Sequence, residues 1–200
     1  MTQEDKQAQN SHKNESDETS LEPTWSQPSH PSLIALHHNP TTASTSSTSL
    51  ISLPPSALFT PLLPSQYALT PTPAYSTLQI SASTHITLLS DLLYTQHSCA
   101  PSLIFDTKAM EVRVAPGREL KVGDALTFFY PSTEWDMARG FECACGADEC
   151  LGEIRGARWL SGEVLGRYWV NEHIKDLVKE RDVKKEELVE EGDAMRSSAQ

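Results

Sequence analysis

The first half of the chain contains no glycine, since the first of its nine glycines is Gly117. Glycine is the residue that lets a backbone approach a ligand closely, so no glycine-rich ligand loop is expected before that point. The chain also lacks a long apolar run, and none approaches the ~18 residues that span a bilayer. The segment MTQEDKQAQN is polar and partly acidic and does not resemble a secretory signal. We therefore expect a nuclear or cytoplasmic protein with no membrane partner.

Positive charge is also scarce. The formal net charge is −11 and the sequence pI is about 5.0, which excludes general nucleic-acid binding through a broad basic face. A basic peptide partner remains compatible with this charge. The sequence holds only four cysteines, and in a reducing compartment clustered cysteines more often bind metal or carry out redox chemistry than form structural disulfides.

Residues 1–48 are rich in Ser, Thr, Gln, Asn, His and Pro, and they include the low-complexity run TTASTSSTS. Few apolar residues interrupt this segment, so it offers little surface whose burial could offset the entropy of ordering the chain. We predict a disordered tail over 1–48. His30, His37 and His38 fall inside it, and we interpret them as solvated residues rather than metal ligands.

Residues 49–138 are predicted to form a mostly β domain built from short strands. The segment MEVRV (110–114) alternates apolar and polar residues, as a half-buried strand does, and ALTFFY (125–130) follows the turn VGD. AYSTLQIS (74–81) and HITLLSDLLY (85–94) contain strand-like stretches. The apolar but proline-broken ISLPPSALFTPLLP suits a loop or short edge strands.

The spacing of apolar residues changes to a helical period over residues 161–195, which we predict to be a C-terminal helical extension. Ser161 or Asn171 could cap a helix, Asp182 could restart one, and Gly192 is a plausible stop. Apolar packing of one face on the domain is favoured over a partner-binding helix, because helices usually owe their stability to such packing. The residues at helical spacing are Leu165, Trp169, Val170, His173, Ile174, Leu177 and Val178.

Three of the four cysteines form the pattern C-x-C-x4-C, with Gly146 after the second thiol. A glycine turn lets thiolates converge on one ion. Three thiolates leave a tetrahedral structural zinc site one ligand short. Cys99 leads the candidates for the fourth position because soft thiolates suit zinc, and His97, His173 and Asp148 are the alternatives. A redox pair is the competing interpretation, but it would not need a third nearby thiol.

Three motifs occur in order: QHSCAPS (96–102), GDALTFFY (123–130) and CACGADECLG (143–152). Together they resemble the C-terminal half of a SET domain and its post-SET zinc module, over roughly residues 90–155. The resemblance implies a β-clip fold in which pseudoknot-type threading brings QHSCAP beside LTFFY, and a zinc module over 139–160. It also implies transfer of a methyl group from S-adenosylmethionine to a lysine amine of a protein or peptide such as a histone tail.

The resemblance assigns roles to individual residues. Tyr130 matches the catalytic tyrosine of the lysine channel, and Phe128 matches an aromatic position of that channel. Cofactor contacts are implied for Gln96, His97, Ser98 and Leu151. One structural zinc is implied on Cys99, Cys143, Cys145 and Cys150.

Departures from the family pattern leave a second function open. The segment 54–62, where the family has a Gly-x-Gly loop, holds no glycine, Gln96 replaces an asparagine, and Ser102 replaces another. The alternatives are an active methyltransferase, a catalytically weakened or inactive zinc-stabilised scaffold, and a plain zinc-binding domain. In the last two cases Tyr130 is a core or interface aromatic and His97 only satisfies a backbone carbonyl.

Overall fold

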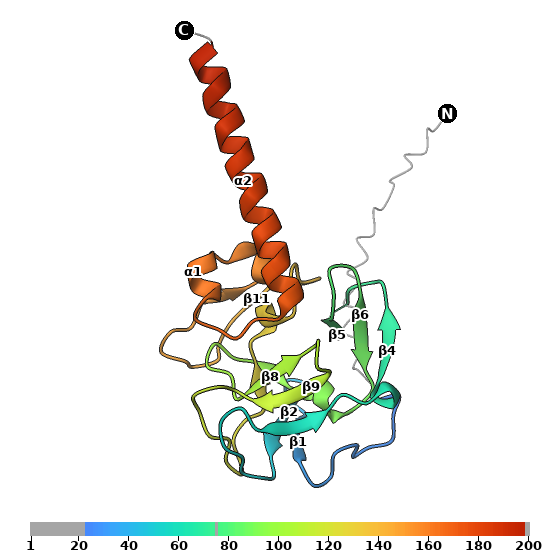
Figure 1. Ribbon diagram of the computed structural model, residues 1–200. Coiled ribbons are helices and arrows are strands. Elements are labelled where there is room, and N and C mark those ends of the chain that lie inside the picture. Colours follow the sequence, from blue (N-terminus) through green and yellow to red (C-terminus); the bar gives the residue numbers. More distant parts are fainter. Residues whose placement is uncertain (1–22, 75, 199–200) are drawn as a thin grey trace, which may run out of the picture.

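The computed structural model describes residues 23–74 and 76–198, and most of its regular elements are short strands followed by one long C-terminal helix (Figure 1). This confirms the predicted fold class. No helix in these two ranges is long and apolar enough to cross a bilayer. The strands are β1 Ile34–Asn39, β2 Ser44–Ser49, β3 Leu58–Pro61, β4 Tyr67–Thr70, β5 Thr77–Gln79, β6 His85–Leu88, β7 Gln96–His97, β8 Leu103–Asp106, β9 Glu111–Val114, β10 Thr127–Phe128, β11 Phe141–Glu142 and β12 Glu153–Ile154, and the helices are α1 Gly162–Leu165 and α2 Glu172–Ser198.

Two three-stranded antiparallel sheets surround the main core. One has the order β3-β9-β8 and the other β4-β6-β5. The predicted alternation in 110–114 is present, because Val112 and Val114 are fully buried while Glu111 and Arg113 are half-buried. The core that these sheets share also takes side chains from the β1–β2 hairpin and from the residues around β10.

The sheet that positions the predicted site is a parallel pair of two-residue strands, β7 and β10. Gln96 lies opposite Thr127, and His97 lies opposite Phe128. The N–H of Ser98 extends the pairing by donating to the carbonyl of Phe128 at 3.0 Å. The predicted approach of QHSCAP to LTFFY is therefore confirmed at the level of backbone hydrogen bonds.

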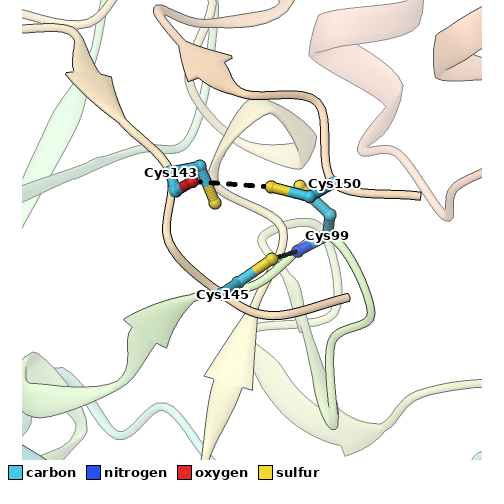
Figure 2. Close-up of side chains that lie close together, drawn as sticks. All are labelled: Cys99, Cys143, Cys145 and Cys150. Atoms are coloured by element: carbon cyan, nitrogen blue, oxygen red, sulfur yellow. Dashed lines mark hydrogen bonds between the residues drawn. The ribbon is translucent and has the colours of Figure 1, made fainter. Parts of the chain in front are cut away.

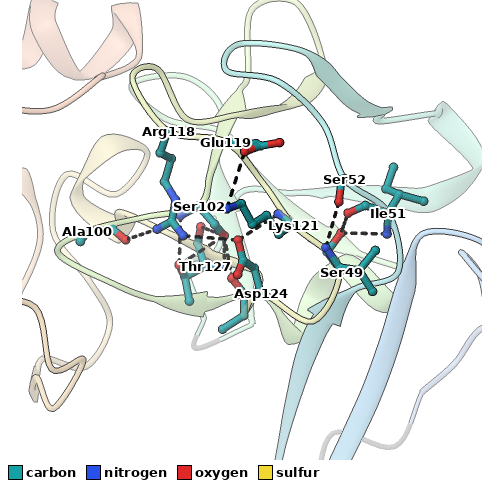
Figure 3. A network of polar contacts seen from close by, with 12 residues as sticks. Ser49, Ile51, Ser52, Ala100, Ser102, Arg118, Glu119, Lys121, Asp124 and Thr127 are labelled. Atoms are coloured by element: carbon teal, nitrogen blue, oxygen red, sulfur yellow. Dashed lines mark hydrogen bonds and ion pairs between the residues drawn. The ribbon is translucent and has the colours of Figure 1, made fainter.

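A polar network fixes the chain just after this pair (Figure 3). The hydroxyl of Ser102 donates to the carbonyl of Ala125 at 2.8 Å and accepts from the N–H of Thr127 at 2.9 Å. Arg118 donates to the carbonyl of Ala100 at 3.2 Å and pairs with Asp124 at 3.6 Å. Ser102, which departs from the family pattern, thus has a structural role in holding the segment after Cys99 against β10.

The C-terminal extension packs on a second apolar cluster, so the packing interpretation of the helical stripe is confirmed for most of its members. The ring of Phe129 stacks on Tyr168 with centroids 3.7 Å apart. Ser161 caps α1 by accepting from the N–H of Val164. Helix α2 then runs past Gly192, so the predicted stop was wrong, and Figure 1 shows its second half projecting from the body. The cluster includes Leu165, Val170 and Ile174, with Leu177 and Val178 packed against it.

Part of the predicted disordered tail is ordered. Residues 34–49 form the β1–β2 hairpin, and Ile34 at its start is buried in the main core. Residues 1–22 of the predicted tail lie outside the described residues. His30 is buried rather than solvated and approaches Ser29 Oγ and the Gln66 side chain through its two ring nitrogens.

The buried carboxylate of Asp91 supplies the physical reason for this order. Its Oδ1 accepts from the side chains of Trp25 and Gln27, and its Oδ2 accepts from the N–H groups of Ser29 and His30. Four donors from one short segment hold that segment against the body. Within the segment 85–94, which was predicted to contain a strand-like stretch, β6 ends at Leu88 and a 3-10 turn over 91–94 carries the acceptor.

Asn171 joins three elements and supports a stability prediction. Its side-chain oxygen accepts from the N–H and hydroxyl of Thr107, and its side-chain nitrogen donates to the carbonyls of Phe105 and Ser132, all at 2.9 Å. Replacing Asn171→Ala leaves these buried groups without partners, so we expect a loss of about 3 kcal/mol or more in urea unfolding. The exposed change Lys175→Ala is the control and should cost less than about 0.5 kcal/mol. Equal stabilities would contradict the assignment.

Candidate functional site

The four cysteine thiols meet at one point (Figure 2). Their sulfur atoms all lie within 4.8 Å of one another, although Cys99 comes from the loop after β7 and the other three from the segment between β11 and β12. Thiolates around a tetrahedral zinc at 2.3 Å would stand roughly 3.8 Å apart. The spacing and the donor chemistry therefore fit one tetrahedral zinc with small adjustments.

Local backbone geometry brings the thiols together. Gly146 has a φ of +72°, a value that glycine adopts without strain, and it turns the chain between Cys145 and Cys150. The antiparallel pairing of β11 with β12 closes the ends of this segment. The N–H of Cys99 points at the sulfur of Cys145 at 3.5 Å, and the N–H of Leu151 points at the sulfur of Cys99 at 3.4 Å.

The thiols of the cluster differ in pKa. Burial raises the pKa of the Cys99 thiol to about 11. Although burial also acts on Cys145, hydrogen bonds from the N–H groups of Cys99 and Ala147 lower its pKa to about 6. Several adjacent thiolates cannot coexist without a positive charge, and a metal ion supplies it.

The two histidines among the alternative fourth ligands have other partners, and Asp148 is not part of the converging group. His97 Nε2 lies 3.4 Å from the Cys99 sulfur, beside the cluster, and its Nδ1 accepts from the N–H of Tyr130 at 3.2 Å. His173 contacts the carbonyl of Thr133 at 2.9 Å. Within the described ranges the group of potential ligands that converges here consists of the four thiols, with Cys99 in the fourth place that the spacing predicts.

His97 connects the thiol cluster to the predicted catalytic tyrosine. Its ring lies 5.2 Å from that of Tyr130 and 5.7 Å from those of Phe129 and Phe141. Burial among these rings lowers the pKa of His97 to about 4, so the imidazole is neutral at pH 7. The interpretation that His97 only satisfies a carbonyl is not what the contacts show, since Nδ1 accepts a hydrogen bond from a backbone N–H.

The backbone N–H and C=O of His97 point away from β10. In a parallel pair, Gln96 and Ser98 direct their backbone groups towards β10, so the N–H and C=O of His97 point to the opposite side. No other strand of the described chain pairs with β7 on that side. The residues predicted to hold a cofactor through backbone groups thus present one donor and one acceptor outside the sheet.

The segment beside Gln96 differs from the predicted one. Gln96 reaches the carbonyl of Thr45 at 3.5 Å, and Ser47 donates to the carbonyl of Tyr94 at 3.1 Å, so β2 is the neighbour. The segment 54–62 instead forms β3, pairs with β9 and buries Phe59 in the main core. The comparison of 54–62 with a cofactor loop was therefore wrong, because its apolar residues serve the core.

A cavity of about 70 Å³ lies beside Tyr130 and Phe128. The hydroxyl of Tyr130 donates to the carbonyl of Thr95 at 3.2 Å, and the ring of Phe128 lies 4.7 Å from that of Tyr130. Both residues predicted for the substrate channel thus border one cavity. Its walls among the described residues come from Ala74, Ser76, Thr77, Leu78, Leu88, Leu92, Leu93, Thr95, Phe128, Tyr130, Glu134, Met137, Ala138 and Arg139.

Glu134 is a wall residue that the sequence analysis missed. It is buried, and its N–H donates to the carbonyl of Tyr130 at 3.0 Å, which closes one turn between the two residues. Burial raises the pKa of Glu134 to about 7, opposed in part by the hydrogen bond from the N–H of Gln79. The one signal in the sequence that links Glu134 to Tyr130 is their four-residue spacing. This spacing is informative only if the chain is known to turn after residue 130.

Comparison with known proteins relates the chain to a methyltransferase. A scan against protein-family models gives no match. A methyltransferase of Aspergillus flavus, flvH, is 48% identical over 156 residues, which cover 78% of this chain and 86% of the relative. The similarity therefore extends across most of both proteins rather than over a single motif.

Zinc content tests the thiol cluster. We expect about one zinc per chain in the purified protein, and Cys99→Ser should abolish tight binding because it removes one of four thiolates. Inductively coupled plasma mass spectrometry measures the content. Ser98→Ala, next to Cys99, is the control and should retain the metal. A wild-type protein without zinc, or an unchanged content in Cys99→Ser, would refute the assignment.

The raised pKa of Glu134 gives a pH prediction. Its ordinary value is 4.5 and its folded value about 7, so between these the unfolded chain loses a proton that the folded chain keeps. Stability from this group is therefore lost as pH rises from about 4.5 to about 7, by on the order of 3 kcal/mol. Glu134→Gln lacks this loss, so its stability relative to wild type should rise over that range in urea unfolding. A pH-independent difference would contradict it.

Proposed function

Because the chain belongs to the family of the methyltransferase flvH, we propose that it transfers a methyl group from S-adenosylmethionine to a lysine amine. The methyl-transfer part of this statement follows from the family. The methyl donor, the lysine acceptor and the SET-type mechanism are the parts that we add.

The observation that carries the proposal is that the β7–β10 pair contributes to two features at once. The N–H and C=O of His97 on β7 point away from β10 and suit the edge of a purine ring, which offers an acceptor and a donor side by side. Phe128 on β10 borders the cavity together with Tyr130. Gln96, His97, Ser98 and Leu151 would hold S-adenosylmethionine, which supplies a methyl group on an electrophilic sulfonium.

The residues around Tyr130 suit an acceptor amine. Methyl transfer requires a neutral amine held in line with the leaving sulfur, in a site that excludes water. Phe128 and Tyr130 border a narrow, largely apolar cavity, and the hydroxyl of Tyr130 is fixed by its bond to the Thr95 carbonyl. We assign Tyr130 the role of orienting the amine and Phe128 that of limiting the width of the channel.

The thiol cluster would act as a structural support for this site. It lies beside His97 and holds Leu151, whose N–H contacts the Cys99 sulfur, close to β7. A net charge of −11 favours a basic partner. We propose a lysine-containing protein or peptide, such as a histone tail, as the acceptor and no direct contact with nucleic acid or membrane.

Calorimetric titration with S-adenosylmethionine and a radiolabelled methyl assay on histones test the proposal. We expect micromolar to millimolar binding and transfer of label to lysine, with kcat reduced roughly a hundredfold in Tyr130→Phe because the amine loses an orienting hydroxyl. Tyr67→Phe, on β4 and away from the cavity, is the matched control. Absence of cofactor binding would instead favour the inactive scaffold, and binding without transfer to lysine would refute the acceptor.

A further inference from the structure

Glu134 is a carboxyl group in an otherwise mainly apolar cavity. It lines the same space as Phe128 and Leu92, and it is only 9% exposed. A carboxyl group in such surroundings is costly to ionise unless a cation or several donors accompany it. The contacts of the two carboxyl oxygens show whether the chain itself supplies a cation or hydrogen-bond donors.

One oxygen of Glu134 is held in place and the other is available. Oε1 accepts from the N–H of Gln79 at 2.7 Å and lies 3.4 Å from the hydroxyl of Thr133. The side-chain oxygen of Gln79 in turn accepts from the N–H of Trp135 at 2.8 Å. No hydrogen bond reaches Oε2 from residues 23–74 or 76–198. The carboxyl group is therefore rigidly placed with half of its hydrogen-bonding capacity unused.

A second wall group has an unused polar atom. Thr95 is 2% exposed and lines the cavity, and its Oγ1 is buried with no partner among the described residues. An unpaired buried hydroxyl costs free energy comparable to a lost hydrogen bond. A ligand with a polar end in this cavity would pair with Glu134 directly, and it would satisfy Thr95 Oγ1, which is itself covered, after a rotation of the Thr95 side chain.

The charged groups near Glu134 leave it without a cation of its own. Arg139 is exposed and also lines the cavity, but it forms no ion pair with Glu134 in the described structure. Burial lowers the pKa of both His85 and His173, so these neighbouring rings are neutral at pH 7. Asp91, which precedes the wall residue Leu92 in the chain, is engaged by four donors of its own.

We propose that this cavity binds the end of a slender alkylammonium ion, with Glu134 Oε2 and Thr95 Oγ1 as the groups that contact the charged nitrogen. A volume of 70 Å³ accepts on the order of five water-sized groups, which suits an unbranched amine rather than a bulky ring. The leucine and phenylalanine walls contact the methylene groups. The ammonium group of a ligand would form the ion pair with Glu134 that no described residue of the chain provides.

The proposal rests on the proposed function for its biological meaning, because the ammonium that binds here would become the neutral amine to be methylated once its N–H bond breaks and the proton passes to the Glu134 carboxylate. Two kinds of molecule could provide the ammonium group. It belongs either to a lysine side chain of a protein or to a free alkylamine. Both carry the same charged nitrogen on an unbranched chain, so one set of probes addresses both.

Calorimetric titration of the zinc-loaded full chain with n-butylamine and with Nα-acetyl-lysine methylamide, without methyl donor, tests the binding. We expect both to bind, 1-butanol to bind far more weakly, and Glu134→Gln to lose about tenfold to a hundredfold in amine affinity. The glutamine keeps the volume and the acceptor for Gln79 N–H. Glu119→Gln, an exposed acid outside the cavity wall, is the matched control and should bind as the wild type does.

Thr95→Val provides a second variant that does not remove a charge. Because the hydroxyl of Thr95 has no partner in the described chain, valine should leave the melting temperature unchanged or raised, while lowering amine affinity severalfold. This outcome separates a ligand contact from a structural role. Lower stability together with unchanged affinity would remove Thr95 from the site.

The outcomes distinguish this inference from the proposed function. Amine binding that depends on Glu134 in a protein without methyl transfer supports the inference and refutes the enzyme. Methyl transfer to lysine that is unchanged in Glu134→Gln, with unchanged amine affinity, overturns the inference and leaves the enzyme intact. Preference for the lysine analogue identifies a protein substrate, and preference for butylamine identifies a free amine.

Discussion

The parallel pairing of β7 with β10 is the constraint on which the site depends. Each strand contributes two residues, and so short a parallel pair has little stability of its own. Two external supports maintain it. One is the network of Ser102 with residues 125–127, and the other is the thiol cluster, which holds Cys99 two residues after the end of β7. Because the supports come from distant parts of the chain, the site forms only once the whole domain has closed.

The sequence predicts those parts of the site whose chemistry is local. Cysteine spacing predicts the cluster. The approach of residues 96–98 to 127–128 is predicted only through the resemblance to SET domains. Prediction from the sequence fails for elements whose structure is determined by long-range contacts. Ser- and Thr-rich residues 44–49 form a strand because Ile34 of their hairpin partner is buried, and no local property of these residues indicates a strand. The segment 54–62 is misplaced for the same reason, since its apolar residues enter the core.

Glu134 is missed for a different reason. A glutamate in a sequence is expected at the surface, because charged side chains are rarely buried without a partner. Its burial follows from a turn that begins at Tyr130 and from Gln79, whose backbone and side chain engage residues 134 and 135 from 55 or more positions away in the sequence. Neither feature has a signature in the residues around 134, so only the fold discloses this carboxyl group.

The two buried carboxyl groups show how function can be separated from structure in such a fold. Asp91 receives four hydrogen bonds, two on each oxygen, and the segment 25–30 that donates them is fixed in return. Glu134 is held through Oε1 by the N–H of Gln79, yet Oε2 accepts no hydrogen bond from the described chain, and the residue lines a mainly apolar cavity. A fully satisfied buried acid stabilises the fold that contains it. A half-satisfied one is a cost that the rest of the fold must offset, and a cation delivered by a ligand is the simplest source of the missing interaction.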